Sequence, residues 1–305
     1  MKNLTLKQLR YFEALLRHAH FGRAADACGI SQPALSVQIK DLEEDLGTAL
    51  FERGPRQVRP TSFGIEFARQ VRDILRAVDE LGELARASRD RLVGRMRIGV
   101  IPTIAPYLLP TLLRELSQEY GDLDIHIRET MTSRLVQELL EGRIDTAIVA
   151  LPVSEPSLTE IPLFSENFVL IRPPLEVPEP IPDAEALRDM RLLLLEEGHC
   201  FRDQALSFCR MNAALPRDGL DGSSLATLVQ MVGAGIGVTL IPEMAVPVET
   251  RAATVTVSRF RSPEPSRTIG MIWRKTSPLA AELRGIAAVV RRSAETMKQA
   301  NDSQA

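Results

Sequence analysis

Two of the three cysteines lie close together in the second half of the chain, in the segment EEGHCFRDQALSFC. Cys200 and Cys209 are nine residues apart, and His199 and Arg202 lie beside Cys200. Cationic neighbours and a helix N-terminus both favour the thiolate form of a cysteine. Peroxide converts a thiolate to a sulfenic acid, and a second thiol within reach condenses with that acid to form a disulfide. These residue types therefore make Cys200 and Cys209 candidates for a peroxidatic and a resolving thiol.

The spacing of the two cysteines would make such a pair a conformational switch. If residues 201–209 are helical, they span roughly 13 Å of helical rise. A disulfide needs Cα atoms about 4.4–6.8 Å apart, so forming the bond must unwind the helix. The alternative is that both cysteines only pack in the core, because free cysteine is often buried and a nine-residue spacing matches no general redox motif. The residues alone leave both interpretations open.

The other residues that could do chemistry have simpler interpretations. Cys28 is expected to be part of a core, and Tyr107 and Trp273 are expected to pack. His126 is expected to be a hydrogen-bonded strand residue, and Thr103 has the alternative role of capping a helix. Four scattered histidines and the lack of a paired carboxylate motif predict no metal site, and no cofactor is expected.

The bulk composition limits the class of protein. A chain of 305 residues fits two or three domains, and 45% hydrophobic with 25% charged residues is ordinary for a soluble globular protein. We expect a cytoplasmic protein without a membrane partner, because no signal peptide or long apolar run is visible and three cysteines suit a reducing compartment. The net charge of −3 gives no overall attraction to nucleic acid, so any DNA contacts must come from locally placed basic groups.

The first part of the chain predicts a helix-turn-helix followed by a hairpin. Three helical segments, TLKQLRYFEALLRHA, FGRAADACGI and SQPALSVQIKDLEEDLG, are separated by short turns. Arginines surround the Gly54–Pro55 turn of the hairpin, which would form a wing that contacts the DNA backbone through Arg53 and Arg56. The alternative is an ordinary three-helix bundle. The third helix turns small and amide-bearing side chains away from its apolar stripe, which suits base edges in the major groove: Ser31, Gln32, Ala34, Ser36, Val37, Gln38 and Lys40.

A long helix is predicted from Ser62 to about Leu92. Its apolar positions alternate spacings of four and three, which indicates a seam that packs against a partner helix in a homodimer: Phe67, Val71, Ile74, Val78, Leu81, Ala85, Ser88 and Leu92. Gly94 then breaks the pattern. We therefore expect a DNA-binding domain at 1–61, a dimerisation helix at 62–93 and a regulatory domain at 94–305.

The regulatory domain is predicted to be α/β. The segments MRIGVI, YLLPTLLRELSQEY, DIHIRET, SRLVQELLEG and DTAIVAL alternate strand and helix, which predicts a parallel sheet. Similar segments continue toward the C-terminus, so we expect two α/β subdomains with a cleft between them. A proline-rich stretch at residues 173–183 is expected to be a surface loop.

The first 65 residues resemble the N-terminal signature of the LysR-type transcriptional regulators, from LRYFEALLRHAHFGRAADACGISQPALSVQIKDLEEDLGTALFER to RPTSFG. The resemblance implies a winged helix-turn-helix, a long dimerisation helix and a regulatory domain like a periplasmic binding protein. It also implies promoter DNA as the partner, homodimers that pair into tetramers, and RNA polymerase as a candidate partner. The contacts it implies are Ser31, Gln32, Pro33, Ser36 and Gln38, whereas Asp41 and Glu44 make the end of that helix acidic.

The segments EEGHCFRDQALSFC, RIGVIPTIAPYLLP and RTIGMIWR resemble the peroxide-sensing members of that family. The resemblance implies that Cys200 reacts with hydrogen peroxide and that Cys209 is its disulfide partner. It places five further residues around the peroxide pocket: Thr103, Thr132, His199, Asp203 and Arg267. We expect a regulator and not an enzyme. The alternatives are a LysR-type regulator that binds a small metabolite between its subdomains, and, less consistent with a DNA-binding half, a thiol peroxidase.

Overall fold

The computed structural model describes residues 4–53, 58–87, 94–174, 187, 190–208 and 221–302. Cys209, Arg56 and most of the proline-rich stretch lie outside the described residues. The chain divides into two compact units, Met1–Leu84 and Ala85–Ala305, and each is described by itself. Among the described helices, none combines the length and the apolar character that a membrane span requires.

Three helices form the body of the first unit, and each has a recognisable beginning. They are α1 (Leu6–His18), α2 (Phe21–Ala27) and α3 (Gln32–Leu46). The Thr5 side chain caps α1 in a capping box with Gln8, and the His20 ring accepts from the backbone N–H of Gly22 to cap α2. Ser31 caps α3, as predicted. These caps fix where each helix begins, and so they fix the tight turn between α2 and α3.

The predicted wing is a two-stranded antiparallel hairpin. It consists of β1 (Phe51–Arg53) and β2 (Val58–Pro60), with Glu52 opposite Arg59. The tip of the hairpin and the side chain of Arg53 lie outside the described residues. With α1, α2 and α3, the hairpin completes a winged helix-turn-helix.

Helix α4 (Ser62–Ala87) follows the hairpin, and part of its predicted seam has a different role. Val71 is buried in the core of the first unit, and the Phe67 ring packs edge-on against Phe12 with centroids 5.2 Å apart. The prediction that Phe67 and Val71 face a partner helix is therefore wrong, because the start of α4 is docked onto α1. Ile74 and Leu81, farther along the same helix, are exposed and remain available to a partner.

The second unit begins with a parallel three-stranded sheet. Its strands are β3 (Gly94–Val100), β4 (Leu123–Glu129) and β5 (Thr146–Leu151), connected by α5 (Ala105–Glu119) and α6 (Thr132–Leu140). Strand β3 pairs in parallel with both β4 and β5. The predicted β-α-β-α-β alternation is confirmed in this half.

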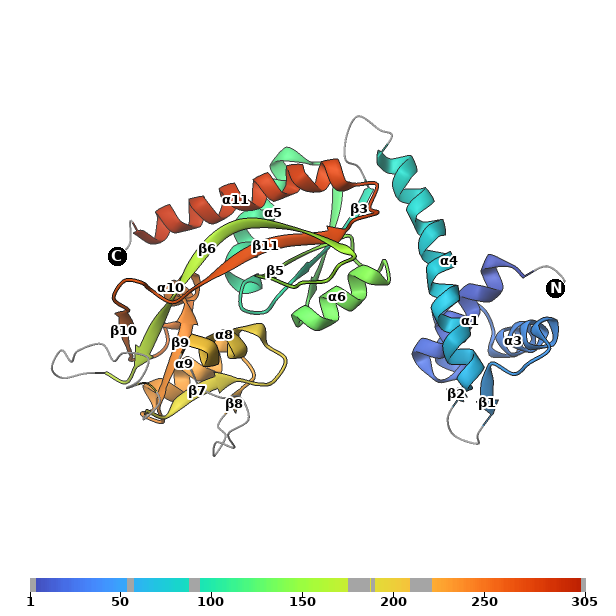
Figure 1. Ribbon diagram of the computed structural model, residues 1–305, viewed down its shortest axis with the longest axis horizontal. Helices are drawn as coiled ribbons and strands as arrows, with labels where there is room; N and C mark the ends of the chain where they lie inside the picture. Colours follow the sequence, from blue (N-terminus) through green and yellow to red (C-terminus); the bar gives the residue numbers. More distant parts are fainter. Residues whose placement is uncertain are drawn as a thin grey trace. The chain divides into compact units, whose positions relative to one another are not determined.

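Beyond β5 the sheet becomes mixed. The long strands β6 (Leu158–Arg172) and β11 (Ser266–Arg274) pair with each other in antiparallel fashion, and β11 also pairs antiparallel with β5. The expectation of a wholly parallel sheet is wrong here, because parallel pairing requires a crossover helix between neighbours. Figure 1 shows the two strands running from the half that contains β5 to the half that contains β9. The strand order among the described residues is β4-β3-β5-β11-β6-β9-β7-β8, with β10 on β6.

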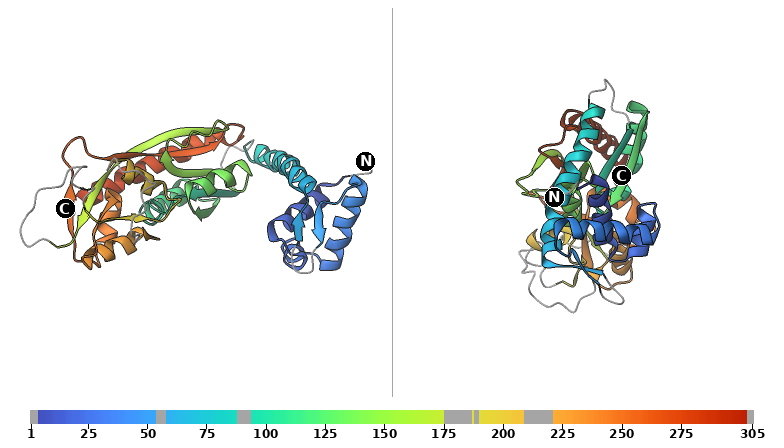
Figure 2. Two further views of the ribbon diagram at one scale, coloured as in Figure 1. Left: turned by 60° about the horizontal axis from the view of Figure 1, so that its bottom comes forward. Right: turned by 90° about the vertical axis from the view of Figure 1, so that its right-hand side faces the viewer.

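The far half has its own core, so the unit contains two subdomains. Its strands are β7 (Leu192–Leu195), β8 (Asp221–Gly222), β9 (Val238–Pro242) and β10 (Thr256–Arg259). Its helices are α8 (Cys200–Phe208), α9 (Leu225–Gly233), the 3-10 turn η1 (Glu243–Ala245) and α10 (Val246–Glu249). The C-terminal helix α11 (Ala280–Asp302) packs against α5 and β6, and Figure 2 shows it along the long strands. The long strands β6 and β11 run through both halves, so they help to fix how the subdomains meet.

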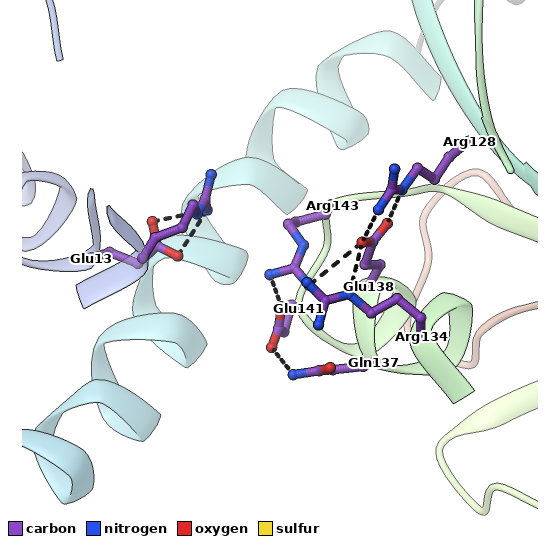
Figure 3. A network of polar contacts seen from close by, with 8 residues as sticks. Glu13, Arg128, Arg134, Gln137, Glu138, Glu141 and Arg143 are labelled. Carbon is purple, nitrogen blue, oxygen red and sulfur yellow. Dashed lines mark hydrogen bonds and ion pairs between the residues drawn. The ribbon is translucent and has the colours of Figure 1, made fainter. Parts of the chain in front are cut away.

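An arginine cluster surrounds a buried carboxylate on α6. Glu138 is 6% exposed and accepts from Arg128 at 3.2 Å. Arg134 lies 3.5 Å and Arg143 3.9 Å from the same carboxylate. Figure 3 shows the three guanidinium groups around it. The arginine side chains are partly exposed, whereas the carboxylate is buried. Removing Glu138 should therefore cost more stability than removing any one of the arginines.

We expect Glu138→Ala to lower the free energy of unfolding by about 1–3 kcal/mol, because three cations lose a buried acceptor. Urea unfolding followed by circular dichroism measures the change. The matched control is Glu119→Ala, which removes a surface pair with Arg292 and should change stability by about 1 kcal/mol or less. Equal losses in the two variants would contradict the role given to Glu138.

Candidate functional site

Cys200 is the first residue of helix α8. It is half-buried, carries a free thiol and packs against the core of the β3–β5 subdomain. The turn before it contains Gly198 at φ +96°, where a Cβ would lie 2.7 Å from the Met131 sulfur. The turn thus favours glycine for its backbone conformation, and any larger residue would also have to displace the Met131 side chain. These constraints place the cysteine at the junction of the two subdomains.

Helix α8 is regular through Phe208, the residue before Cys209. The eight steps from Cys200 to Phe208 correspond to about 12 Å of rise at 1.5 Å per residue. Cys209 itself lies outside the described residues. A disulfide to the residue that follows Phe208 is incompatible with this helix, since bridged Cα atoms lie about 4.4–6.8 Å apart.

Two groups beside Cys200 were expected to be cationic, His199 and Arg202. Burial disfavours the charged form of His199, and Arg202 is engaged in an ion pair. His199 is 8% exposed, and burial lowers its pKa from the ordinary 6.5, with Glu196 offsetting part of the effect. His199 is therefore neutral at pH 7, and the expectation that it supplies a positive charge is wrong because desolvation disfavours the imidazolium. Arg202 pairs with Asp221 at 2.9 Å and donates to the Leu195 carbonyl at 2.7 Å.

Arg267 is buried at the centre of a polar junction. Its Nη1 donates to the Thr103 hydroxyl at 2.8 Å, and its Nη2 donates to the Thr103 carbonyl at 3.0 Å. Its Nε donates to Glu166 at 2.8 Å. The guanidinium also lies over the Phe201 ring, 5.3 Å from the centroid. Because Phe201 follows Cys200, this one side chain ties the β3–α5 loop to the first turn of α8.

A cavity of about 420 Å³ lies between the subdomains, next to this junction. Thr103 and His199 line it together, from β3–α5 on one side and the turn before α8 on the other. Tyr107 and Glu249 also line it and join the subdomains, since the Tyr107 hydroxyl donates to Glu249 at 2.7 Å. Burial and this acceptor raise the pKa of Tyr107, so the hydroxyl keeps its proton. The volume is sufficient for a small molecule.

The other residues predicted for this pocket, Arg267, Thr132 and Asp203, are not among the residues that line the cavity. Arg267 lies behind Thr103, and its hydrogen bonds show that Thr103 accepts from arginine and does not cap α5. Thr132, at the start of α6, has a buried hydroxyl without a hydrogen-bond partner among the described residues. Asp203 is exposed on α8 and does not line the cavity. The roles assigned to these residues stay predictions.

Sequence reasoning missed Glu166, Phe201 and the Tyr107–Glu249 link. Glu166 sits mid-strand outside any motif, and only the register of β6 against β11 places it opposite Arg267. Tyr107 was expected to pack, and it does, but its hydroxyl spans 142 residues of sequence to reach Glu249. No local signal in the sequence identifies such pairs.

The α3 surface agrees with a DNA-contacting helix. Leu35, Ile39 and Leu42 are buried in the core of the first unit. The opposite side exposes or half-exposes the predicted contacts: Ser31, Gln32, Pro33, Ser36, Gln38 and Lys40. Val37 is 54% exposed among them, an apolar side chain of the kind that contacts thymine methyl groups.

The remaining candidates follow the simpler interpretations. Cys28 is half-buried, and burial raises the pKa of its thiol. His126 hydrogen-bonds Asp124 at 2.8 Å, and Trp273 is buried. Within the described ranges, no group of histidine, cysteine and carboxylate side chains is arranged to hold a metal ion.

Comparison with known proteins finds two family models on this chain. "Bacterial regulatory helix-turn-helix protein, lysR family" matches residues 6–65, and "LysR substrate binding domain" matches residues 89–295. A probable hydrogen peroxide-inducible genes activator from Streptomyces viridosporus is 44% identical over 292 residues, covering 94% of this chain and 93% of the relative. The dual regulator OxyR of Escherichia coli K12 is 40% identical, covering 94% and 95%.

Solved structures give the same result. A full-length cysteine-to-aspartate variant of OxyR from Pseudomonas aeruginosa superposes with a TM-score of 0.74 at 37% identity, covering 95% of this chain and 98% of that one. A peroxide-bound cysteine-to-serine variant of OxyR from Corynebacterium glutamicum superposes with a TM-score of 0.65 at 35% identity, covering 99% and 96%.

The burial of His199 predicts a pH dependence of stability. Its pKa in the folded chain lies below the ordinary 6.5, so the unfolded chain binds the proton more readily. The free energy of unfolding therefore does not depend on the protonation of His199 well above pH 6.5, and it decreases as the pH falls below 6.5. We expect His199→Gln to lose less stability than the unsubstituted protein between about pH 7.5 and about pH 5.5. Urea unfolding at both pH values measures this, and an identical loss in the two proteins would contradict it.

Proposed function

The chain belongs to the LysR-type transcriptional regulators, and we propose that it is a peroxide sensor that regulates promoters through a Cys200–Cys209 disulfide. Similarity to hydrogen peroxide-inducible activators extends over 94% of the chain, beyond the DNA-binding unit that all relatives of this family share. The structural observation that carries the proposal is helix α8, which starts at the reactive cysteine and ends one residue before its partner.

The first unit supplies the DNA contacts. Helix α3 enters the major groove with its exposed face, and the β1–β2 wing contacts the backbone. The exposed Ile74 and Leu81 of α4 are covered by the same helix of a second copy, which gives a dimer with two recognition helices. Two such dimers form the active tetramer on a promoter, in the cytoplasm, within reach of RNA polymerase.

The chemistry needs two thiols and one peroxide. The Cys200 thiolate attacks one oxygen of hydrogen peroxide, the O–O bond breaks, and the departing hydroxide takes a proton to become water. Sulfur loses two electrons and peroxide gains them, leaving a sulfenic acid on Cys200. The Cys209 sulfur then attacks Cys200, its own proton and the hydroxyl leave as a second water, and a disulfide remains. Each sensor reacts once per reduction by a cellular thiol, which distinguishes it from an enzyme that consumes peroxide.

The disulfide changes the fold because helix α8 carries the chain away from Cys200 as far as Phe208, the residue before Cys209. Closing the bond requires α8 to unwind, which releases Phe201 from Arg267 and from the Phe168 ring 4.9 Å away. Phe168 and Phe201 belong to one subdomain core, whereas Arg267 links Phe201 to Thr103 of the other subdomain, so the rearrangement alters the surface that each regulatory domain presents. The reduced and oxidised proteins then hold their DNA-binding units in different arrangements.

The interdomain cavity favours a second candidate function. At about 420 Å³ it is much larger than hydrogen peroxide, and it is lined from both subdomains by Thr103, His199, Tyr107 and Glu249. A small metabolite bound there would hold the two subdomains together. Under this alternative the cysteines are inert, so the redox experiment below separates the two functions.

We expect stoichiometric peroxide to oxidise both Cys200 and Cys209 to one intramolecular disulfide, with loss of helical signal. Cys200→Ser should abolish the change in promoter occupancy, because no sulfenic acid forms. Cys209→Ser should form the sulfenic acid without the disulfide. Thiol counting, dimedone labelling and peptide mapping without reductant measure these products.

Cys28→Ser is the matched control for this experiment, since Cys28 lies in the other unit and should not contribute. A Cys200→Ser protein that still responds to peroxide would rule out the mechanism. Free Cys200 and Cys209 after peroxide, together with thermal stabilisation by a metabolite, would favour the second candidate function.

For DNA recognition we expect Gln32→Ala to weaken binding to a selected operator by about tenfold while leaving binding to unrelated duplex unchanged, because base contacts carry specificity. Fluorescence anisotropy with both duplexes at several salt concentrations measures this. A uniform loss on both duplexes would instead assign Gln32 to the backbone or to folding.

A further inference from the structure

Glu166 is a buried carboxylate that takes no part in the peroxide reaction of Cys200 and Cys209. It is 6% exposed on β6, directly across from Arg267 on β11. One carboxylate oxygen accepts from Arg267 Nε at 2.8 Å, and the other accepts from the backbone N–H of Met244 at 3.2 Å. Both oxygens are thus engaged, and the carboxylate is fixed between β11 and η1.

This carboxylate determines where the Arg267 guanidinium points. Glu166 holds Nε and also lies 2.8 Å from Nη2, while Nη1 reaches the Thr103 hydroxyl and Nη2 reaches its carbonyl. A guanidinium has five N–H donors in a fixed plane and no acceptor, so fixing one edge fixes the other. Burial of the carboxylate raises the pKa of Glu166, and the arginine offsets part of that rise.

The arginine in turn determines the polarity of the Thr103 hydroxyl. Because arginine can only donate, the Thr103 oxygen must accept at 2.8 Å. The hydroxyl hydrogen is then directed to another acceptor, and Thr103 lines the cavity. A hydroxyl fixed in this way acts as a hydrogen-bond donor toward the cavity. A freely rotating hydroxyl could also act there as an acceptor.

We propose that Glu166 is a positioning residue for peroxide reduction: through Arg267 it holds the Thr103 hydroxyl as a hydrogen-bond donor toward the peroxide oxygen that departs from Cys200. Negative charge grows on that oxygen as the O–O bond breaks, and a donor already in place stabilises it. The inference rests on the proposed peroxide chemistry of Cys200. It adds the residue that orients the donor.

Glu166→Gln tests this role in the full-length protein. Met244 and Arg267 donate to different carboxylate oxygens, and an amide offers an acceptor at only one of these two positions. The substitution therefore removes one of the two hydrogen bonds together with the negative charge that holds the guanidinium. We expect the second-order rate of Cys200 oxidation by hydrogen peroxide to fall by about tenfold or more. Alkylation of Cys200 by iodoacetamide should keep its rate, because that reaction needs no donor on a departing oxygen.

Glu138→Gln is the matched control, because it also replaces a buried carboxylate bound by arginine in the same unit, but Glu138 accepts from Arg128 and not from Arg267. Both of its rates should equal those of the unsubstituted protein. Thr103→Val should slow peroxide oxidation, and adding Glu166→Gln to it should slow oxidation no further, because the two residues act on one hydroxyl. Thr103→Ser should restore the rate. Glu166→Asp, which keeps the charge, provides a second variant if the amide does not fold.

Three results would overturn the inference. One is an unchanged peroxide rate in both Glu166 variants. Another is an equal fall of the peroxide and alkylation rates, which would show that Glu166 only maintains the fold. The last is multiplication of the Glu166 and Thr103 effects in the double variant. If the unsubstituted protein fails to react with peroxide at Cys200, the proposed function fails as well, whereas normal oxidation with any of the three results removes only the inference.

Discussion

The regulatory unit depends on one buried cation. Arg267 is 4% exposed, and a guanidinium cannot shed its charge when it is buried. Its position is therefore acceptable only while Glu166, Thr103 and the Phe201 ring all surround it. These partners come from β6, the β3–α5 loop and α8, which belong to different subdomains. The requirement to satisfy one charge thus holds three separate segments of the chain in register.

That requirement explains why the first turn of α8 is a suitable place for a reactive thiol. Cys200 precedes Phe201, so any reaction that displaces the turn also disturbs the packing around Arg267. The described part of helix α8 is nine residues long, and isolated helices of that length are marginal in water, so tertiary contacts contribute to its stability. Forming a Cys200–Cys209 disulfide therefore requires little free energy to unwind the helix, but it disturbs the contacts between the subdomains.

Some of the residues around the Cys200 thiol line the cavity, and others lie behind its lining. Thr103 and His199 line the cavity, whereas Arg267 and Glu166 lie behind it and control the groups in front. Burial lowers the pKa of His199, which favours its neutral form at this position. The site therefore relies on the direction of its hydrogen bonds. The residues beside Cys200 in the sequence had instead suggested that positive charge would be the main effect.

The sequence by itself determined the local features: Ser31 as a helix cap, the apolar stripe of α3, the β1–β2 hairpin, the alternation from β3 to β5 and the cysteine spacing. Each depends on residues a few positions apart, whose periodicity and capping are visible in one dimension. Only the tertiary structure decided that Phe67 and Val71 belong to a core, that the sheet becomes mixed at β6 and β11, that His199 is neutral and that Glu166 faces Arg267. Those outcomes depend on burial and on strand register between segments about a hundred residues apart, and neither quantity is encoded in local spacing.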